Sequence, residues 1–259
     1  MFELAHISFA HGAKTVIDDV SLRLTRGCFY GIIGPNGSGK TTLIDLLTGH
    51  LRPDSGRVLL DGRDLRDFSR KALARRIALV PQDFRINFPY SCREVVMMGR
   101  YPHIPRFTAP AAADRQMVNS VLRQASLTEF AHRPVHQLSG GERQRVVFAR
   151  SLAQDTEALL LDEATANLDV HHALALLDLA AGRAAAGRLV VAVLQDINLA
   201  AMYCGRLVVM QEGRVFAHGP LDEVLTEQTL HAVFKVKARV ARHAFSGARQ
   251  VVFQREAVV

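Results

Sequence analysis

Cysteine is scarce in this sequence, and no long apolar run is present. The three cysteines, Cys28, Cys92 and Cys204, lie far apart and never form a C-x-x-C pair, so neither a disulfide framework nor a thiolate zinc site is indicated. No stretch approaches the about 20 apolar residues that span a bilayer, and the first residues lack the apolar core and cleavage site of a signal peptide. We therefore expect a protein of the reducing cytosol that is neither exported by a signal peptide nor inserted into a membrane by itself.

Low-complexity linkers and internal repeats are also missing from the 259 residues. Hydrophobic residues make up 49% and charged residues 22%, a balance that favours a globular chain over disordered, collagen-like or coiled-coil classes. Lysine and arginine number 32 against 25 acidic residues, which gives a net charge of +7. This positive surplus favours binding to a polyanion but does not indicate which polyanion.

Apolar residues follow two strand patterns. Alternation across the first 27 residues is typical of half-buried antiparallel strands. Four short apolar runs, each followed by polar or glycine-rich residues and a helical pattern, are typical of fully buried parallel strands. These runs are 28–33, 77–80, 158–161 and 189–194.

The stretch between the second and third runs is mostly helical in pattern. Ser91 with Glu94, and Ser139 with Glu142, have the S-x-x-E spacing of a helix capping box. An apolar stripe at helical spacing comprises Met117, Val118, Val121 and Leu122. We therefore expect a helical lobe inserted into an α/β core. The tail returns to strand character around Gly213, turns helical over 221–234, and ends in a basic segment that the pattern does not assign.

A glycine-rich loop follows the first buried run and precedes a helical run. Its sequence matches G-x-x-x-x-G-K-[ST], in which backbone N–H groups and a helix N-terminus surround a phosphate chain. Lys40 is expected to reach the β- and γ-phosphates, and the Thr41 hydroxyl to ligate Mg²⁺. The predicted phosphate-binding residues are Gly34, Pro35, Asn36, Gly37, Ser38, Gly39, Lys40, Thr41 and Thr42. The fold expectation is an α/β protein: a P-loop NTPase core with an antiparallel β subdomain and an inserted helical subdomain.

Two adjacent carboxylates end the third buried run. Neighbouring side chains at a strand end diverge, so Asp162 and Glu163 should have different tasks. Asp162 is expected to anchor Mg²⁺, and Glu163 to act as the general base for a water that attacks the γ-phosphate. Structural alternatives are a helix N-cap for Asp162 and a surface charge for Glu163. The pair favours nucleotide hydrolysis.

The sequence LSGGERQR, residues 138–145, indicates which class of nucleotide hydrolase this chain resembles. With the phosphate loop and the Asp162–Glu163 pair, it resembles the ATP-binding-cassette (ABC) ATPases over almost the whole chain. The resemblance implies one such domain over 1–259, with core segments 1–82 and 155–259 and a helical lobe over 83–154. It implies catalytic roles for Gln82 and Gln195 beside Glu163, Mg²⁺ binding by Gln82 as well, and a D-loop around Ala166-Asn167-Leu168-Asp169.

Ser139 and the glycines after it leave free N–H groups at a helix start, a second anion site on the same chain. A self-satisfied capping box without a ligand is the structural alternative. The resemblance implies a head-to-tail homodimer in which two ATP molecules are bound at the interface. In that dimer the signature residues of one copy close on the γ-phosphate held by the other, and they are Ser139, Gly140, Gly141 and Glu142.

The sequence departs from the family pattern in several places. His11 stands where a tyrosine usually stacks on adenine, and a plain loop histidine is about as good an interpretation. Gln195 replaces the switch histidine, which predicts slower hydrolysis because glutamine donates to a γ-phosphate without carrying charge. Ala164 replaces a common proline, with little effect expected. For His171 and the histidine after it, a solvated helix start is favoured over a metal pair, since adjacent helical side chains point apart.

The kind of cassette ATPase can also be predicted. Gln82 and Ser139 are separated by a compact segment, which leaves no room for the coiled coils or zinc modules of the DNA-repair members. The stretch 88–103 resembles the cassette subunits of importers for iron–siderophore complexes, haem and cobalamin. The resemblance implies a peripheral subunit at the cytoplasmic face of the inner membrane, bound to a polytopic permease and, indirectly, to a substrate-binding protein. No nucleic acid is expected, because basic and aromatic residues are not interleaved. A cassette ATPase acting as a nucleic-acid or assembly factor is the alternative.

The permease is expected to dock on the surface between Gln82 and Arg100. Met97, Met98 and Tyr101 fit packing inside a helical core at least as well as contact with a permease.

Overall fold

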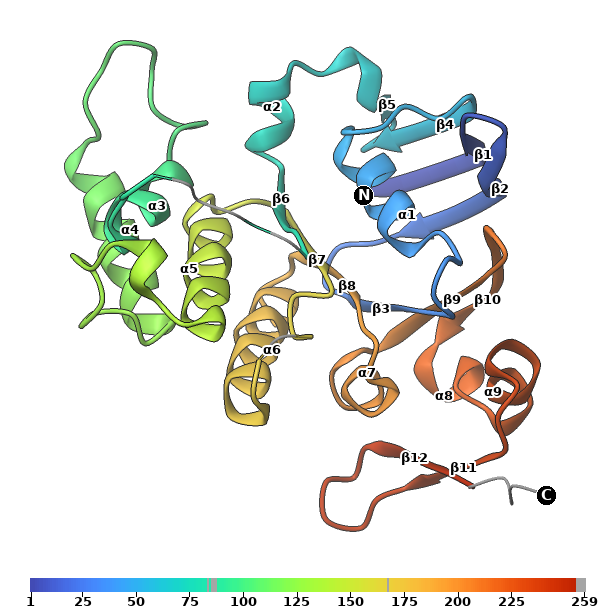
Figure 1. Cartoon of the computed structure of the whole chain (residues 1–259). Coiled ribbons are helices and arrows are strands. Elements are labelled where there is room, and N and C mark those ends of the chain that lie inside the picture. Colours follow the sequence, from blue (N-terminus) through green and yellow to red (C-terminus); the bar gives the residue numbers. More distant parts are fainter. Residues whose placement is uncertain (83, 85–87, 167, 255–259) are drawn as a thin grey trace.

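The computed structural model describes residues 1–82, 84, 88–166 and 168–254. Figure 1 shows the chain as two sheets beside a separate group of helices, with a small hairpin at the C-terminal end. The elements are β1 (Phe2–His11), β2 (Lys14–Leu24), β3 (Phe29–Ile33), α1 (Lys40–Thr48), β4 (Ser55–Leu60), β5 (Arg63–Asp64), η1 (Leu65–Asp67), α2 (Arg70–Ala74), β6 (Ile77–Val80), α3 (Cys92–Met98), α4 (Ala112–Gln124), η2 (Val135–Gln137), α5 (Gly140–Ala153), β7 (Ala158–Asp162), α6 (Val170–Ala185), β8 (Leu189–Val193), α7 (Ile197–Tyr203), β9 (Arg206–Gln211), β10 (Arg214–Pro220), α8 (Leu221–Val224), α9 (Glu227–Phe234), β11 (Ala238–Arg242) and β12 (Arg249–Phe253).

The central sheet contains the four predicted buried strands. Its order is β10-β9-β3-β8-β7-β6, and all neighbours are parallel except β9 and β10. Every residue of β3, β7 and β8 is buried, as expected for strands covered on both faces. The carboxyl ends of β3, β8, β7 and β6 therefore meet at one edge of the sheet, where ligands bind in open α/β folds.

An antiparallel sheet of order β2-β1-β4-β5 covers one side of this core, as the alternating N-terminal pattern predicts. Helix α1 lies between the two sheets (Figure 1). Its Leu43 and Leu47 are buried in the same cluster as Leu4 and Ile17 of the antiparallel sheet and Val191 of the central sheet. Apolar burial on both sides of α1 therefore fixes the helix that begins at the phosphate loop.

Helices α3, α4 and α5 form the predicted helical lobe, left of the central sheet in Figure 1. Both expected capping boxes are present: Ser91 and Glu94 begin α3, and Ser139 and Glu142 begin α5. The predicted stripe on α4 is buried at Val118, Val121 and Leu122 and partly buried at Met117. This lobe shares one continuous apolar cluster with the helix-covered face of the central sheet.

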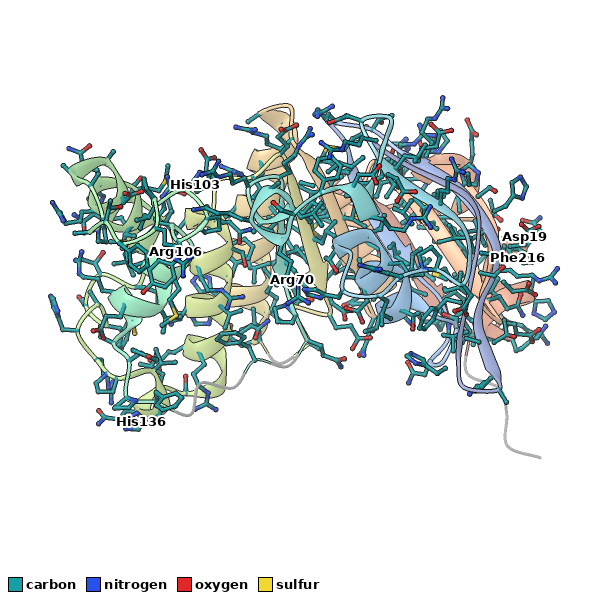
Figure 2. The ribbon with its side chains drawn as sticks, turned by 90° about the horizontal axis from the view of Figure 1, so that it is seen from above. Asp19, Arg70, His103, Arg106, His136 and Phe216 are labelled. Atoms are coloured by element: carbon teal, nitrogen blue, oxygen red, sulfur yellow. The ribbon has the colours of Figure 1, made fainter. Side chains whose placement is uncertain are left out.

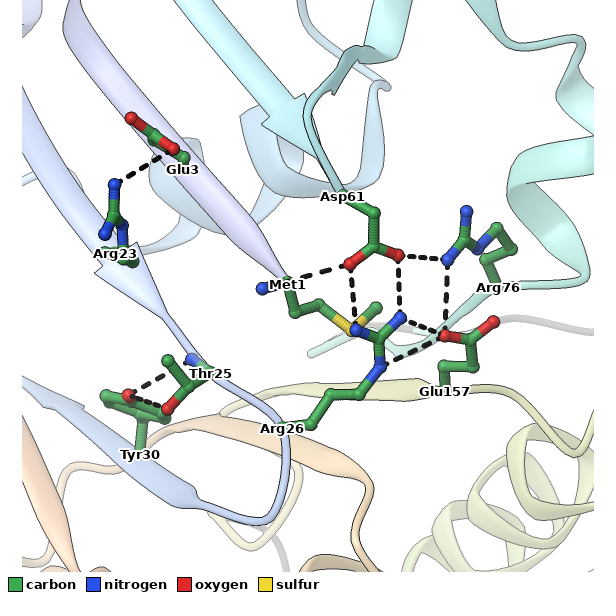
Figure 3. Close-up of polar contacts among 9 residues, drawn as sticks. All are labelled: Met1, Glu3, Arg23, Thr25, Arg26, Tyr30, Asp61, Arg76 and Glu157. Atoms are coloured by element: carbon green, nitrogen blue, oxygen red, sulfur yellow. Dashed lines mark hydrogen bonds and ion pairs between the residues drawn. The ribbon is translucent and has the colours of Figure 1, made fainter.

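A charge network joins the antiparallel sheet to the central core (Figure 3). Arg26 donates to both oxygens of Asp61, at 2.8 and 2.7 Å, and also pairs with Glu157. Arg76 pairs with the same two carboxylates. The hydrogen bond from Arg26 holds the pKa of Asp61 below its ordinary value. The network therefore connects the segments before β3, after β4, before β6 and before β7.

The C-terminal part of the chain adds two short helices and a hairpin. The predicted helical stretch 221–234 is divided into α8 and α9, and the unassigned basic segment is the β11–β12 hairpin. Asn198 on α7 exchanges two hydrogen bonds with Val251, which attaches β12 to the core. Among the described residues, no helix combines the length and the apolar character needed to cross a membrane.

Candidate nucleotide site

The loop between β3 and α1 is shaped by close backbone contacts. Gly39 precedes α1 in a left-handed conformation with φ 98°, and a Cβ there would lie 2.7 Å from the carbonyl oxygen of Val16. A Cβ on Gly34 would lie 2.2 Å from the carbonyl oxygen of Met210. Both positions therefore require glycine, which leaves the backbone amides of the loop free to approach a ligand.

Lys40 begins α1 and is almost fully buried, with 6% of its surface exposed. Its Nζ donates to the carbonyl oxygens of Gly34 and Pro35, each at 2.9 Å, so the side chain folds back over the loop. Burial lowers the pKa of this ammonium, while the charges of Glu163 and Asp162 act in the opposite direction. The cation is thus already placed at the centre of the loop.

Ser38 provides an independent sign that the loop accommodates a ligand. Its side chain is 3% exposed, and its Oγ has no hydrogen-bond partner among the described residues. A buried hydroxyl without a partner carries a free-energy cost that an oxygen-rich ligand would remove. The described loop therefore suits a phosphate group.

Asp162 and Thr41 face each other across the loop and the end of β7. Thr41 Oγ1 donates to Asp162 Oδ1 at 3.3 Å. Burial raises the pKa of Asp162 to about 6, so the carboxylate lacks sufficient compensation in the protein alone. One hydroxyl and one carboxylate oxygen are the hard donors that Mg²⁺ prefers, and a cation would favour the ionised carboxylate. The pair fits the predicted magnesium site.

Three side chains meet at the ends of neighbouring strands. Gln82 follows β6, Glu163 follows β7 and Gln195 follows β8. Gln82 Nε2 donates to Glu163 Oε2 at 2.9 Å, and Gln195 Nε2 donates to the same oxygen at 2.5 Å. The three predicted catalytic residues therefore form one group, and Asp162 lies outside it, as expected from the divergence of neighbouring side chains.

A cleft of about 620 Å³ connects the phosphate loop with this group. Sequence reasoning missed two hairpin segments in its wall, residues 14–16 and Glu212–Gly213. The N–H of Gly213 donates to the carbonyl oxygen of Ser38 at 3.2 Å, which joins the second segment to the loop. The lining residues are Lys14, Thr15, Val16, Asn36, Gly37, Gly39, Lys40, Thr41, Thr42, Gln82, Glu163, Gln195, Glu212 and Gly213.

His11 lies beside this cleft rather than in its wall. It ends β1, is paired with Lys14 of β2, and its ring contacts the Phe9 ring edge-on, with centroids 4.8 Å apart. Lys14 and Thr15, one turn further along the hairpin, do line the cleft. The adenine-stacking role expected for His11 stays a prediction.

The signature residues occupy a different part of the molecule. Ser139 caps α5, accepting from the N–H of Glu142 at 3.2 Å, and Glu142 accepts in return from the N–H of Ser139 at 2.7 Å. Ser139 and Gly140 are exposed. The described residues that line the cleft include none of the four signature residues. Figure 2 shows the width of the molecule, with His136 on the lobe and Asp19 on the antiparallel sheet at opposite ends.

The predicted D-loop leads into α6. Asp169 caps this helix and accepts from the N–H of His172 at 2.9 Å, whereas Asn167 lies outside the described residues. The expectation that the side chains of His171 and His172 point apart was wrong, because their rings lie edge to face with centroids 5.2 Å apart. Asp169 orients the second ring by hydrogen bonds to Nδ1. Within the described part of the chain, no three or more histidine, cysteine, aspartate or glutamate side chains form a group that could hold a metal ion.

The fold and the cleft define a P-loop nucleotide-binding protein, and the helical lobe carries a capping box at Ser139 and Glu142. A family model described as ABC transporter matches residues 17–166, and the chain belongs to this family. The fold expectation is confirmed: the chain has the mixed α/β fold of the ABC ATPases, with an antiparallel sheet, a mostly parallel sheet and a helical lobe.

Curated relatives share the sequence over most of this chain. The cobalamin import ATP-binding protein of Halobacterium salinarum is 43% identical over 90% of the chain, and the chain spans 58% of that relative's length. The hemin import ATP-binding protein of Nocardia farcinica is 44% identical over 93% of the chain and 83% of its own length.

Solved structures of ABC transporter proteins have folds similar to that of this chain. One describes an inward-facing conformation of a proposed metal-chelate type ABC transporter; its TM-score is 0.84 at 28% identity, covering 98% of this chain and 97% of that one. Another is a dimeric ATP-binding cassette in a post-hydrolysis state with ADP and Pi, with a TM-score of 0.75 at 28% identity over 85% of this chain and 99% of that one.

Proposed function

We propose that this chain is the ATP-hydrolysing, nucleotide-binding subunit of an importer for a metal-chelate type substrate. One observation carries the hydrolytic part of the proposal: a single cleft brings Lys40, Thr41 and the phosphate loop together with Glu163, and Thr41 donates a hydrogen bond to Asp162, its partner in the predicted magnesium site. Binding groups and a candidate base are thus within one cavity, which suits hydrolysis better than binding alone.

Different residues of the chain would bind the nucleotide and promote its hydrolysis. The loop amides and Lys40 bind the β- and γ-phosphates, and Glu163 accepts the proton of the attacking water. Thr41, Asp162 and Gln82 would hold Mg²⁺, which supplies charge neutralisation at the phosphates when bound. Burial of Lys40 strengthens its interaction with an anion, because less water competes for the ammonium.

The active form would be a homodimer with ATP at the interface. Ser139 and Gly141 lie on the helical lobe, at the start of α5. One chain needs only one set of phosphate ligands for its own ATP. We therefore assign the helix start at Ser139 to the ATP held by a second copy of the chain. The dimeric cassette with ADP and Pi, similar in fold, supports this arrangement. In the proposed dimer the exposed helix start at Ser139 faces the γ-phosphate held by the partner's loop.

A polytopic permease would be the membrane partner, with the chain bound peripherally to it at the cytoplasmic face of the inner membrane and a substrate-binding protein acting indirectly. The names of the hemin and cobalamin relatives support importer function and a haem or cobalamin substrate. An iron–siderophore substrate rests on the sequence resemblance of the stretch 88–103. The proposed docking surface, 82–100, exposes 65% of Phe88 and 40% of Tyr90. Residues 83 and 85–87 of this surface lie outside the described residues. Of the three side chains considered earlier, Met97 packs against the core, Met98 is half-buried and Tyr101 is 58% exposed.

Reconstitution tests this proposal. The chain is co-expressed with a candidate polytopic permease, purified as a complex, and placed in liposomes with ATP and Mg²⁺ inside. We expect ATP hydrolysis and uptake of one of hemin, cobalamin or a ferric siderophore, both lost in the Lys40→Ala complex. Failure to co-purify with any polytopic membrane protein, together with ATPase activity stimulated by nucleic acid, would favour a non-transport role instead.

A further inference from the structure

Two glutamine amides converge on one oxygen of Glu163. They come from the ends of β6 and β8, the two strands that flank β7 in the sheet. Both donate to Oε2, Gln82 at 2.9 Å and Gln195 at 2.5 Å. The order of the sheet, rather than sequence proximity, therefore builds this three-residue contact.

The backbone of Glu163 is held in place independently of its side chain. Its φ is 48°, a left-handed conformation that non-glycine residues rarely adopt. Its N–H donates to the carbonyl oxygen of Val193 at 3.2 Å, and its own carbonyl accepts from the N–H of Ala166 at 3.1 Å. With the main chain fixed at β8 and at the following turn, the rotatable side chain is the part of Glu163 that still needs positioning.

Amide donors suit this task chemically. A glutamine N–H bonded to a carboxylate is a charge-assisted contact, yet the amide carries no charge of its own. It can orient the carboxylate without neutralising it, whereas a cationic donor would form an ion pair with the base. Because both amides use Oε2, the other carboxylate oxygen, Oε1, is the one that can accept from a water in the cleft.

We propose that Gln195 is a positioning residue that acts through Glu163, and that with Gln82 it forms a two-amide clamp on Oε2. The clamp rests on the proposed function, in which Glu163 is the base for ATP hydrolysis. It departs from the sequence expectation that Gln195 donates to the γ-phosphate. In this chain the amide at position 195 orients the base, and phosphate recognition is left to the loop and Lys40.

Nucleotide affinity distinguishes the two roles without requiring turnover. ATP and ADP, each with Mg²⁺, are titrated into the full chain carrying Glu163→Ala, with and without Gln195→Ala. A clamp that acts only on Glu163 predicts changes in both Kd values of less than about twofold, since its partner is already absent. Weaker ATP binding with unchanged ADP binding would show a direct contact with the γ-phosphate and overturn the clamp.

Steady-state hydrolysis of ATP by the full chain supplies the second readout. Gln195→Ala should lower the rate at saturating ATP by about tenfold at unchanged KM, a part of the 10²–10⁴-fold that a positioned base contributes. Gln195→Glu keeps the size of the side chain but removes the donor, and should lose at least as much. In the Glu163→Ala background, Gln195→Ala should cause no further loss. Gln124→Ala, an exposed glutamine of α4, is the matched control and should retain the wild-type rate.

Failure of the clamp and failure of the proposed function give different experimental results. If the wild-type chain hydrolyses ATP but Gln195→Ala is equally fast, or if the losses from Glu163→Ala and Gln195→Ala multiply, the clamp is wrong and the proposed function stands. If the wild-type chain and its permease complex bind Mg²⁺–ATP without hydrolysing it, the proposed function fails and the clamp fails with it.

Discussion

Asp162→Asn should make the nucleotide-free protein more stable while removing its response to Mg²⁺. The Asp162 carboxyl is 5% exposed, and burial raises its pKa to about 6 from an ordinary value of 3.8. A raised pKa for an acid means that the folded protein disfavours the ionised form. The cost is therefore fully present above pH 6, falls as the pH drops through about 6, and vanishes below the unfolded pKa.

The size of the effect follows from the shift. One pKa unit corresponds to about 1.4 kcal/mol, so the shift sets an upper limit of about 3 kcal/mol. Asparagine is close in shape and keeps a carbonyl oxygen for the hydroxyl of Thr41, which donates to Asp162 at 3.3 Å. We expect a gain of about 1–3 kcal/mol in the free energy of unfolding at pH 7.5, or roughly 2–4 °C in Tm for each kcal/mol.

Thermal unfolding of the full chain without nucleotide or Mg²⁺ measures this gain at pH 7.5 and again at pH 5. The gain should shrink at pH 5, where wild-type Asp162 is largely protonated in the folded state. In parallel titrations, Mg²⁺ should strengthen ATP binding to the wild type and not to the variant. An Asp162→Asn protein no more stable than wild type at pH 7.5, or one whose gain is the same at both pH values, would refute this reasoning.

Three other substitutions probe the rest of the site and the fold. Lys40→Ala should raise the Kd for Mg²⁺–ATP in a titration, because a buried ammonium is lost from the loop; unchanged affinity would contradict its placement. Glu163→Gln should bind ATP normally and lower turnover by roughly 10²–10⁴-fold, and a wild-type rate would reject Glu163 as the base. Asp61→Asn should lower Tm at neutral pH and reduce the loss of stability in acid. Arg26 lowers the pKa of Asp61 in the folded protein. The ionised Asp61 carboxylate therefore stabilises the fold above its unfolded pKa, and this stabilisation is lost as the pH falls through its lower folded-state pKa. Equal acid profiles for variant and wild type would show that this network adds nothing.

Much of the fold could be predicted because buried strands and helices require apolar residues at regular positions in the sequence. The four apolar runs of the central sheet match β3, β6, β7 and β8 to within a residue at each end, since strands covered on both faces admit few polar residues. The S-x-x-E spacings were sufficient for the starts of α3 and α5, because a capping box is a local arrangement. The C-terminal hairpin was not predicted, since arginines and exposed positions mask its alternation.

The site was predicted less completely. The phosphate loop, Asp162 and Glu163 follow strand ends and could be placed by motif and by sheet logic. Lys14 and Glu212 could not, because they reach the cleft through hairpins whose position depends on how the antiparallel sheet and β10 pack against the loop. The contact of Gln195 with Glu163 was also beyond sequence reasoning, since a side chain's hydrogen-bond partner depends on geometry between strands.

In the proposed dimer, ATP brings two copies of the chain together through the helix start at Ser139. The most direct measurement is the solution mass of the full-chain Glu163→Gln protein, with and without ATP and Mg²⁺, in three forms: as it stands, with Ser139→Glu, and with Ser69→Glu. Both serines are exposed helix N-caps, so the last variant controls for loss of a cap. We expect ATP-dependent dimers for the first and third forms and monomers for the second, because a carboxylate at 139 would repel the γ-phosphate held by the partner. Monomers in all three forms, or a dimer that Ser139→Glu leaves intact, would contradict the account.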